Sequence, residues 1–367
     1  MKWFDIKNIE SIDSPALVVY PDRIKRNIEL AKKIAGDVDR LRPHVKTNKI
    51  LEVCQMMVQA GITKFKCATI AEAGMLSTRG VKDILLAYQP VGPKIKGLIH
   101  LILVNKDIRF SCLVDNPESA YIINDYCRGQ QIRLHVFIDV NIGMNRTGIR
   151  PEQAPSLANL IIKECDYLNL IGLHGYDGHI HDSDLQERQR KADLAYELLK
   201  ETFQKIQPLV PYPLTKVIGG TPTFPIHARR PDCECSPGTF VFWDKGYGQA
   251  YRDMRFNYAA LVISRVISII DSQHICLDLG YKAVASENPL PRVYFLNEPN
   301  AKPVAQSEEH LVVKVSDSSQ YAIGQVFYGV PHHICPTVAL YDDAYVIDEG
   351  RIFKTWEIIA RKRYFFF

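Results

Sequence analysis

Long hydrophobic runs and a large excess of charge are both missing from this sequence. An apolar stretch such as 258–270 is interrupted by Ser264 and Arg265 and is too short to span a bilayer. The net charge is only +4, and no dense block of lysine and arginine indicates a nucleic-acid partner. The first five residues lack the continuous apolar segment of a secretory signal. We therefore expect neither a membrane nor a nucleic-acid partner, and a cytoplasmic location.

A disulfide framework is also absent. The nine cysteines are scattered along the chain, and their odd number and irregular spacing favour reduced thiols in a reducing compartment. Cys233 and Cys235 are too close together to form a CxxC pair. Most of the cysteines are therefore expected to be plain buried residues.

Short apolar runs alternate with helical patterns through the first two-thirds of the chain. Residues 16–20 predict a buried strand, and an apolar stripe from Ile24 to Ile34 predicts the helix that follows. Further strands are expected at 64–67, 83–87, 112–114, 134–140, 168–173 and 216–218, and helices at 71–78, 117–126, 154–164 and 184–206. About eight such repeats predict an α/β fold, a closed (β/α)8 barrel.

The pattern changes after Gly238, where strands follow one another with few helical stripes between them. Strands are expected at 258–269, 274–277, 292–295, 310–315, 325–327, 337–341 and 344–347. Strands without intervening helices indicate a separate, mainly-β domain. We expect a barrel over 15–238 and a β domain over 239–367, with residues 1–14 packing against the β domain.

Lys46 lies in the segment Arg-Pro-His-Val-Lys-Thr-Asn-Lys at 42–49, where a barrel strand is expected to end. A lysine that forms a Schiff base must lose its proton, and a nearby cation or a dry pocket promotes that loss. Arg42, His44 and Lys49 place cationic or dipolar groups around it. From composition alone, a basic surface loop is the simpler interpretation.

His333 and Cys335 lie two residues apart before the strand-like run 337–341. An extended backbone there would direct both side chains to the same side. Imidazole and thiolate suit Zn²⁺, and two protein ligands would leave positions open for water and substrate. The alternative is a packed cysteine beside a chance pair of histidines, His332 and His333.

The segment at 42–49 closely resembles the cofactor-lysine segment of the D-threonine aldolase and eukaryotic D-serine dehydratase family. These are pyridoxal-phosphate enzymes of the alanine racemase fold. The resemblance begins with Ser-Pro-Ala-Leu-Val-Val at 14–19 and continues with Cys-Ala-Thr-Ile-Ala-Glu-Ala at 67–73. It ends with Gly-Val-Pro-His-His-Ile-Cys-Pro-Thr at 329–337. The resemblance implies that Lys46 binds pyridoxal 5'-phosphate as a Schiff base.

Two loops after predicted strands supply the other expected cofactor contacts. In the family an arginine in the loop after residues 138–140 approaches the phenolic oxygen of the cofactor, which implies Arg146. The turn Gly219-Gly220-Thr221 follows a strand late in the barrel, where backbone N–H groups and a hydroxyl suit a phosphate. A glycine-rich turn alone is weak evidence, and the resemblance implies its role as the phosphate site.

Tyr176 and His179 end another predicted strand. Tyr176 is a candidate to pack on or near the cofactor ring, and His179 to hydrogen-bond the substrate or act as a general base. Both residues are equally consistent with ordinary strand-end positions.

The resemblance also places a divalent metal at His333 and Cys335, with zinc favoured over manganese. In the family an asparagine often precedes the metal histidine, whereas this chain has His332. His332 is therefore a competing candidate, although the spacing to Cys335 favours His333. In related enzymes the active site lies between the barrel of one subunit and the β domain of the other, which implies a homodimer.

A metal beside the cofactor indicates an amino-acid substrate with a β-hydroxyl group, whose oxygen the metal would polarise. Retro-aldol cleavage to glycine and an aldehyde is the favoured reaction, and dehydration to pyruvate and ammonia is the alternative. The second alternative is an amino-acid racemase, which would need no metal, or a non-catalytic pyridoxal-phosphate carrier, which would lack the long β region. The D-stereochemistry follows from the resemblance only.

Overall fold

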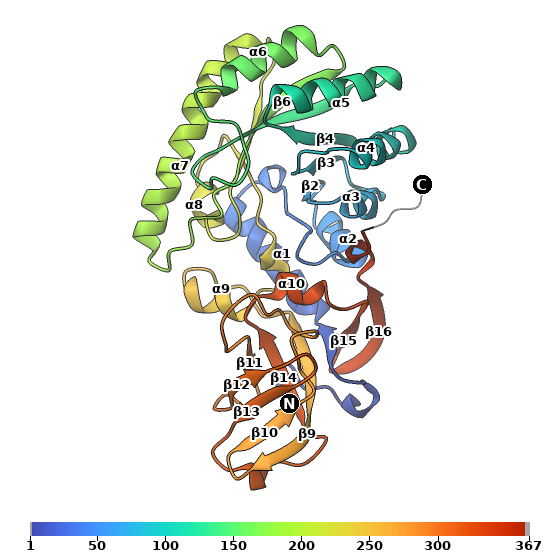
Figure 1. Ribbon diagram of the computed structural model, residues 1–367, viewed down its shortest axis with the longest axis vertical. Helices are drawn as coiled ribbons and strands as arrows, with labels where there is room; N and C mark the ends of the chain where they lie inside the picture. The colour runs from blue at the N-terminus through green and yellow to red at the C-terminus, as the bar shows by residue number, and fades with distance from the viewer. Residues whose placement is uncertain (1, 364–367) are drawn as a thin grey trace. The chain divides into compact units, whose positions relative to one another are not determined.

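The computed structural model describes residues 2–363 (Figure 1). Residues 364–367, the end of the expected β domain, lie outside the described residues. By its internal contacts the described chain divides into two compact units. One unit contains the residues up to Leu30, Thr47–Val53 and Thr239–Arg361, and the other contains Ala31–Lys46 and Cys54–Gly238.

Parallel strands form the sheet of the unit that contains Cys54–Gly238. In sheet order they are β2 (Lys64–Cys67), β3 (Asp83–Leu86), β4 (Arg109–Val114), β5 (Leu134–Val140), β6 (Leu168–Gly175), β7 (Thr215–Ile218) and β8 (Glu234–Cys235). Each pairs in parallel with the next along the chain, as strands joined by crossover helices must. Leu85, Leu113, Phe137 and Val217 form a small apolar cluster contributed by β3, β4, β5 and β7.

Residues 41–45 close this sheet into a barrel. Leu41 pairs in parallel with Cys235 of β8, and His44 pairs in parallel with Lys66 of β2. The predicted (β/α)8 barrel is therefore confirmed, although the sequence indicated no strand at 41–45.

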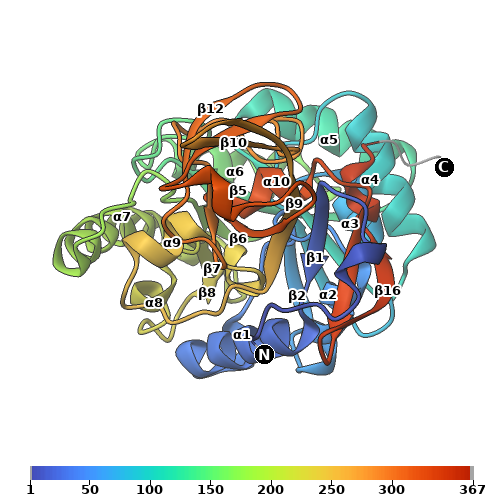
Figure 2. The same cartoon turned by 90° about the horizontal axis from the view of Figure 1, so that it is seen from below.

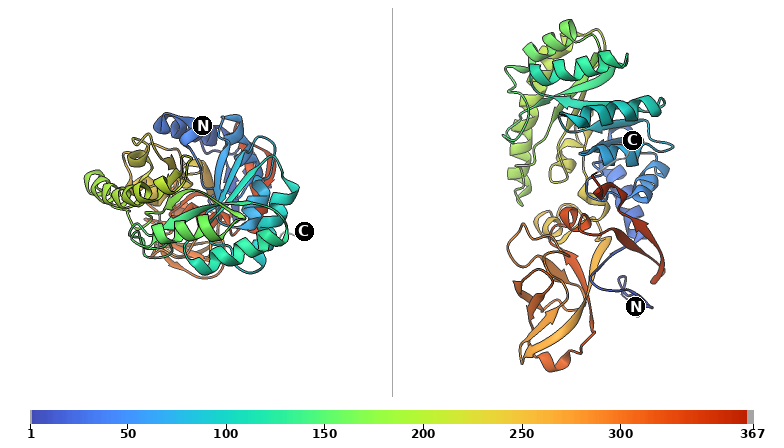
Figure 3. Two further views of the ribbon diagram at one scale, coloured as in Figure 1. Left: turned by 90° about the horizontal axis from the view of Figure 1, so that it is seen from above. Right: turned by 45° about the vertical axis from the view of Figure 1, so that its right-hand side comes forward.

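Helices connect the barrel strands. They are α2 (Leu51–Gln59), α3 (Ile70–Leu76), α4 (Pro93–Val104), α5 (Pro117–Gly129), α6 (Ala154–Glu164), α7 (Leu185–Ile206) and α8 (Phe224–His227), preceded by α1 (Pro21–Ala35). Helix α3 is capped at its N-terminus, because Thr69 Oγ1 accepts from the N–H of Glu72 and the Glu72 carboxylate accepts from the N–H of Ala68, the residue before the cap. The helices drawn from teal to yellow-green lie outside the strands in the left view of Figure 3. No helix among residues 2–363 is both long and apolar enough to cross a membrane.

The second unit is mainly β, as expected. Its strands are β1 (Ala16–Val19), β9 (Ala260–Asp271), β10 (His274–Leu277), β11 (Val293–Phe295), β12 (Lys302–Gln306), β13 (Leu311–Lys314), β14 (Val326–Pro331), β15 (Asp343–Asp348) and β16 (Arg351–Glu357). The main path of the sheet runs β12-β13-β10-β9-β1-β15-β16, and β14 pairs with β9 and β11. Two short helices, α9 (Lys245–Ala250) and α10 (Ile334–Val338), belong to the same unit.

The strand predicted at 16–20 exists, but it does not belong to the barrel. As β1 it pairs antiparallel with β9 on one side and parallel with β15 on the other. Figure 2 labels β1, drawn in dark blue, beside β9. Val18 and Tyr20 contribute to an apolar core that also contains Leu261 and Val330. The predicted number of barrel strands was therefore correct, but the predicted membership was not, because 41–45 and not 16–20 completes the barrel.

The prediction of a strand at 337–341 is wrong. Helix α10 occupies Ile334–Val338, with His333 as its N-cap residue. The hydroxyl of Thr337 donates to the carbonyl of His333 at 2.8 Å and accepts from the N–H of Ala285 at 3.1 Å. These buried hydrogen bonds fix a helical turn in a short apolar run whose sequence does not distinguish strand from helix.

Candidate active site in the barrel and metal pair in the β unit

Lys46 directly follows the closing strand 41–45, at its carboxyl end. Residues 41–45 are buried, as are Thr47 and Asn48, whereas Lys46 itself is exposed. Active sites of (β/α)8 barrels lie at the carboxyl ends of the strands. The structure thus places the predicted cofactor lysine where such a site is expected and leaves its side chain accessible.

Arg42 does not supply the free cation that the sequence placed near Lys46. Its guanidinium is completely buried and lies 2.6 Å from both Asp83 Oδ1 and Glu234 Oε2. Lys64 pairs with the other oxygen of Glu234 at 2.7 Å. The charge of Arg42 is therefore balanced by two carboxylates, and these ion pairs join residues inside the barrel.

Three cationic side chains lie close to the ring of Tyr176. The Lys46 Nζ lies 5.8 Å from the ring centroid, the Arg146 Cζ 4.9 Å and the Lys66 Nζ 5.6 Å. A cation within about 6 Å of an aromatic face is attracted by the quadrupole of the ring. The structure thus brings together three residues predicted from the sequence, Lys46, Arg146 and Tyr176, and adds Lys66, which was not predicted.

Lys66 belongs to a buried chain of polar groups. Its Nζ lies 3.0 Å from His174 Nε2, and His174 Nδ1 lies 2.7 Å from Asp139 Oδ1. The other Asp139 oxygen accepts from Thr147 Oγ1 at 2.9 Å and from Gln89 Nε2 at 3.0 Å. Lys66, His174 and Asp139 come from β2, β6 and β5 and link these strands inside the barrel.

Burial and the positive charge of Lys46 lower the pKa of Lys66 to about 7. Burial alone would raise the pKa of Asp139, but the hydrogen bonds from His174, Thr147 and Gln89 lower it below its usual value. Burial, followed by the charge of Lys66, lowers the pKa of His174. At neutral pH Asp139 is therefore a carboxylate and His174 a neutral imidazole.

The predicted phosphate turn follows β7, and the described side chains support its shape. Gly219 has a φ of +81°, and a Cβ there would lie 2.7 Å from the Cδ2 of His227. A Cβ on Gly220 would lie 3.1 Å from the Tyr176 ring. The positive φ and the 2.7 Å approach require glycine at 219, and the tight approach favours it at 220, as in backbone cradles for phosphate.

Asp177 holds this turn in place through buried hydrogen bonds. It accepts from Thr223 Oγ1 at 3.0 Å and lies 2.7 Å from His227 Nε2. Thr223 Oγ1 in turn lies 3.4 Å from the backbone nitrogen of Gly220. Because Asp177 directly follows Tyr176, the turn and the aromatic ring are fixed by adjacent residues of one loop.

A second loop joins the phosphate turn at the end of β8. Thr221 Oγ1 accepts from the N–H of Gly238 at 3.0 Å. Two residues before Gly238, the hydroxyl of Ser236 is buried and has no hydrogen-bond partner among the described residues. A buried polar group without a partner is costly, and phosphate sites of barrels commonly lie after the seventh and eighth strands. Ser236 is therefore a further candidate to bind a phosphate.

His179 is exposed and lies against Gly143, where an added Cβ would be 2.8 Å from its Nε2. Gly143 belongs to the loop that carries Arg146. This contact places His179 beside the loop after β5, and its role as a base stays a prediction.

His333 and Cys335 are brought together in the β unit, but by the first turn of α10 and not by extended backbone. The side chains of His333 and Cys335 are hydrogen-bonded to each other. His333 Nδ1 lies 2.5 Å from Glu287 Oε1, and Cys335 Sγ lies 3.1 Å from the Thr47 hydroxyl. An imidazole held by a carboxylate at one nitrogen presents the other nitrogen to a metal, as metal-binding histidines usually do.

The thiol and imidazole favour each other's charged forms. Burial opposes ionisation of Cys335, but the hydrogen bond and charge of His333 bring its pKa below the usual value. Burial likewise opposes the imidazolium, but Cys335 and Glu287 raise the pKa of His333 to about 9. A thiolate is the form that binds a metal. Between residues 2 and 363 no group of three or more His, Cys, Asp or Glu side chains is arranged to hold a metal ion, and the role of His333 and Cys335 as metal ligands stays a prediction.

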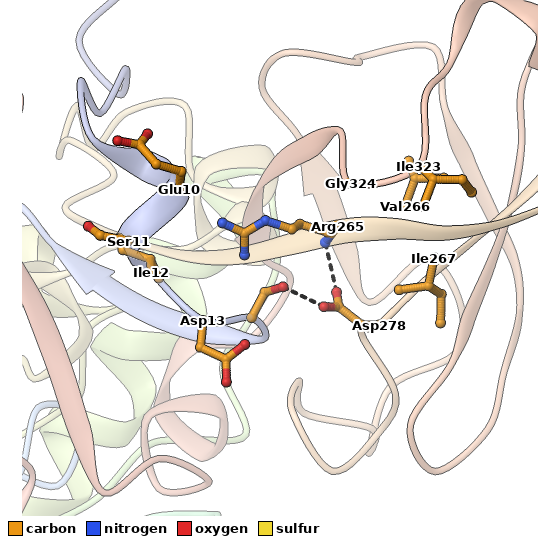
Figure 4. Close-up of a pocket in the computed structure, with 11 residues that line it drawn as sticks. Glu10, Ser11, Ile12, Asp13, Arg265, Val266, Ile267, Asp278, Ile323 and Gly324 are labelled. Carbon is orange, nitrogen blue, oxygen red and sulfur yellow. Dashed lines mark hydrogen bonds between the residues drawn. The ribbon is translucent and has the colours of Figure 1, made fainter.

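The β unit also has a pocket of about 630 Å³ beside β9 (Figure 4). Its Asp278 carboxylate already accepts from Ser14 Oγ at 2.5 Å and from the N–H of Arg265 at 2.7 Å. Since Asp278 is satisfied and no predicted site residue lines this pocket, it does not compete with the barrel site.

The residues missed by sequence reasoning are mostly polar residues inside the barrel. Lys66, His174 and Asp139 lie on strands that were predicted correctly, but their partners come from other strands. The available signal was the pattern Lys-Phe-Lys-Cys at 64–67, in which alternate positions of a buried strand are charged. A lysine inside a barrel needs a hydrogen-bond or charge partner, and the sequence alone does not identify that partner.

The residues present fit pyridoxal phosphate. An accessible lysine, an aromatic ring, an arginine beside that ring and a glycine turn with a buried unpartnered hydroxyl near it are the groups that such a cofactor requires. In the β unit, a thiolate and an imidazole form a donor set that suits zinc.

Comparisons with known proteins agree with this arrangement. Residues 19–242 match the family described as "Alanine racemase, N-terminal domain", and residues 259–347 match a "Putative serine dehydratase domain". The first match covers more than half of the chain, including Lys46, Arg146, Tyr176 and the Gly219–Thr221 turn.

Relatives of known activity are similar over nearly their whole length. A D-threonine aldolase of Arthrobacter sp is 27% identical over 357 residues, which cover 95% of this chain and 93% of the relative. A D-serine dehydratase of Dictyostelium discoideum is 23% identical, covering 93% of this chain and 95% of the relative. The crystal structure of D-threonine aldolase from Filomicrobium marinum has the same fold, with a TM-score of 0.88, 24% identity and 98% of each chain covered. The chain therefore belongs to the alanine racemase N-terminal domain family, in its D-threonine aldolase and D-serine dehydratase-like group of pyridoxal-phosphate-dependent lyases.

Proposed function

We propose that this chain cleaves D-β-hydroxy-α-amino acids by a retro-aldol reaction to glycine and an aldehyde, with pyridoxal 5'-phosphate and a divalent metal as cofactors. The observation that carries the proposal is the accessible amine of Lys46, which shares the ring of Tyr176 with Arg146. The 27% identity to a D-threonine aldolase supports the choice of reaction.

The residues of the barrel would hold pyridoxal phosphate in a defined orientation. Lys46 would bind its aldehyde carbon, Arg146 its phenolic oxygen, and Tyr176 would pack beside its ring. Gly219, Gly220 and Thr221 would bind the phosphate, and Ser236 would add a hydroxyl. When bound, the cofactor withdraws electrons from Cα of an amino acid and weakens the bonds to that carbon.

His333 and Cys335 would hold the metal, with zinc favoured over manganese because thiolate and imidazole are the ligands present. The metal would polarise the β-hydroxyl of the substrate. Glu287 would orient His333 through its 2.5 Å hydrogen bond to Nδ1 and leave Nε2 to bind the metal. Thr47, the residue after Lys46 in the chain, has its hydroxyl 3.1 Å from Cys335 Sγ.

His179 would accept the proton of the β-hydroxyl or hydrogen-bond the substrate, and its exposed ring is accessible for either role. Lys46, once released from the cofactor, would be available to move a proton at Cα. We also propose that the protein works as a homodimer, which sedimentation would show as a mass about twice that of the chain.

Dehydration of D-serine to pyruvate and ammonia is the second candidate. Its support is the match of residues 259–347 to a serine dehydratase domain and the similarity to a D-serine dehydratase. In this reaction Lys46 would remove the α-proton while the metal assists loss of the hydroxyl.

Product analysis separates the two reactions. The protein loaded with pyridoxal phosphate and zinc is incubated with D-threonine, D-serine and their L-forms. Acetaldehyde and glycine from D-threonine support the aldolase, and pyruvate with ammonia from D-serine supports the dehydratase. Lys46→Ala should abolish turnover, whereas Lys49→Ala, the matched lysine of the same segment, should retain it. Turnover by Lys46→Ala equal to wild type would refute the proposal.

The metal is tested with the same assay after chelation. A chelator, His333→Ala and Cys335→Ala should each lower turnover at least about tenfold, while His332→Ala should have a smaller effect. Activity that resists chelation would remove the metal from the proposal and leave the cofactor assignment intact.

A further inference from the structure

Asp244, in the β unit, is a buried carboxylate for which the proposed function has no use. It is only 1% exposed, and a carboxylate is rarely buried without a charged partner. Asp83, in the barrel, has such partners, because it is paired with Arg42 and Arg109. Asp244 instead accepts hydrogen bonds from two backbone N–H groups, and no cationic side chain among the described residues lies at ion-pair distance from it.

The two N–H groups donate one to each oxygen of Asp244. Oδ1 accepts from the N–H of Tyr247 at 2.9 Å and so caps α9 at its N-terminus. Oδ2 accepts from the N–H of Ile334 at 3.1 Å. Ile334 lies between His333 and Cys335 in the chain, so Asp244 is hydrogen-bonded to the backbone that joins the two proposed metal ligands.

A further hydrogen bond joins the same two segments. The N–H of Gly246 donates to the carbonyl of His332 at 2.9 Å. A Cβ on Gly246 would lie 2.7 Å from that carbonyl oxygen, so this close approach requires glycine. Residues 244–246 therefore hold the chain both directly before and directly after His333.

The turn that presents Asp244 is strained. Trp243, the residue before it, has a φ of +55°, a left-handed conformation that a bulky residue rarely adopts. The Trp243 ring is buried, and its centroid lies 5.2 Å from that of Phe256 and 5.6 Å from that of Tyr247. Strained backbone persists only where the surrounding structure holds it, and it is common at functional sites. Packing of Trp243 thus fixes the turn from which Asp244 reaches Ile334.

The charge of Asp244 acts on both proposed ligands. The pKa shifts of His333 and Cys335 arise mainly from burial and from each other, and the charge of Asp244 contributes to both. Burial raises the pKa of Asp244 to about 6 against the effect of its two N–H donors, so it is a carboxylate at pH 7.5. A buried charge without a counter-charge is costly, and a cation bound by His333 and Cys335 would supply one.

We propose that Asp244 is a positioning residue for the metal: it holds the backbone between His333 and Cys335 and supplies a buried negative charge that favours a divalent over a monovalent cation. It acts through the backbone and through its charge, because no three His, Cys, Asp or Glu side chains among residues 2–363 are arranged to hold a metal ion. The inference rests on the proposed function of His333 and Cys335 as metal ligands. The energy of a cation near a fixed charge is proportional to the charge of the cation, so loss of Asp244 penalises a dication more than a monocation.

The experiment compares the affinities of the protein for Zn²⁺ and Cu⁺, two ions that bind thiolate and imidazole. The full chain is loaded with pyridoxal phosphate and freed of metal, and anaerobic competition with a chromophoric chelator gives each dissociation constant. Asp244→Asn removes the charge and retains one oxygen that accepts an N–H. It should lower Zn²⁺ affinity about tenfold or more. The ratio of Zn²⁺ to Cu⁺ affinity should fall about threefold, because a tenfold loss for a dication corresponds to about threefold for a monocation.

Two matched variants separate charge from geometry. Gly246→Ala places a Cβ against the carbonyl of His332 and leaves the charge of Asp244 in place, so it should weaken both ions by the same factor. Asp184→Asn changes an aspartate that caps α7 in the other compact unit and should leave both affinities unchanged. Urea unfolding shows whether each variant is folded in the titration. Asp244→Ser, an uncharged residue that also caps helices, gives the same test if the asparagine variant does not fold.

A wild-type ratio of Zn²⁺ to Cu⁺ affinity in the folded Asp244 variants would overturn the role of the charge. Wild-type affinities for both ions would overturn the positioning role as well, and the proposed function would stand in either case. If His333→Ala and Cys335→Ala bind Zn²⁺ as tightly as wild type, the proposed metal site fails and the inference fails with it.

Discussion

Three cationic side chains lie near the ring of Tyr176. Their mutual repulsion is unfavourable unless another interaction opposes it. Lys46, Arg146 and Lys66 lie 4.9 to 5.8 Å from the ring centroid, and a Cβ added to Gly220 would lie 3.1 Å from the ring. Cation–π attraction contributes about 0.5–1 kcal/mol for an exposed cation and about 2 kcal/mol for a desolvated one. The aromatic ring is therefore what allows these side chains to converge.

Replacing this ring tests its role. Tyr176→Phe retains the π face and should change the dissociation constant for pyridoxal phosphate less than about threefold, whereas Tyr176→Leu should weaken binding about tenfold. Absorbance titration of the cofactor-free variants measures both constants. Equal affinities for the Phe and Leu variants would show that the ring only fills space.

At the scale of single residues the sequence predicted the groups that resemble a known pattern and missed the groups that support them. Lys46, Arg146 and Tyr176 lie together as expected. Lys66 and His174 were not predicted, because their importance comes from a contact between β2 and β6, which are more than one hundred residues apart.

Helix α10 illustrates what local sequence does not determine. An apolar run of five residues fits a strand or a helical turn equally well, and tertiary hydrogen bonds decide between them. Here Thr337 joins the carbonyl of His333 to the N–H of Ala285 and thereby closes the turn that carries Cys335. His333 and Cys335 lie together as expected, but the predicted strand geometry was wrong, and their role as metal ligands stays a prediction.

Thr337 is therefore expected to support both stability and metal binding. Thr337→Val leaves the Ala285 N–H buried without a partner and should lower the free energy of unfolding by about 1–3 kcal/mol. It should also weaken zinc binding about tenfold or more by loosening the turn. Urea unfolding and zinc titration measure the two effects. Thr337→Ser retains the hydroxyl and serves as the control; if it weakens zinc binding as much as the valine variant, the hydrogen bonds are not the cause.

At the scale of the whole barrel, the alternation of strands and helices was sufficient to predict the fold, but the strand that closes it was not recognised. Residues 41–45 contain Pro43 and have Arg42 directed toward Asp83 and Glu234, so they lack the apolar character of an ordinary buried strand. Their strand character depends on carboxylates from β3 and β8, distant in sequence.

This ion cluster predicts a pH-dependent stability. Burial opposes ionisation of Asp83, but Arg42 and then Arg109 bring its pKa below the usual value. Asp83 thus contributes stability that is present above the pKa of the unfolded chain and is lost as the pH falls through the lower pKa of the folded protein. Arg42→Met leaves buried carboxylates without their main partner and should lower the free energy of unfolding by about 3–5 kcal/mol at pH 7.5.

The deficit of Arg42→Met should shrink on acidification to about pH 4.5, because the unpaired carboxyl groups then take up protons more readily than in the unfolded chain. Urea unfolding at the two pH values measures the difference from wild type. A deficit that is independent of pH would mean that lost packing, and not unpaired charge, destabilises the variant.

Strand β1 has a consequence for the order in which the protein folds. Val18 is paired with Leu261 of β9 on one side and with Tyr345 of β15 on the other. During synthesis this strand therefore leaves the ribosome before all the strands of the barrel and waits for partners that follow them. Its edges stay unpaired until β9 and then β15 have emerged, and until then this stretch of four buried apolar residues is a natural target for chaperones.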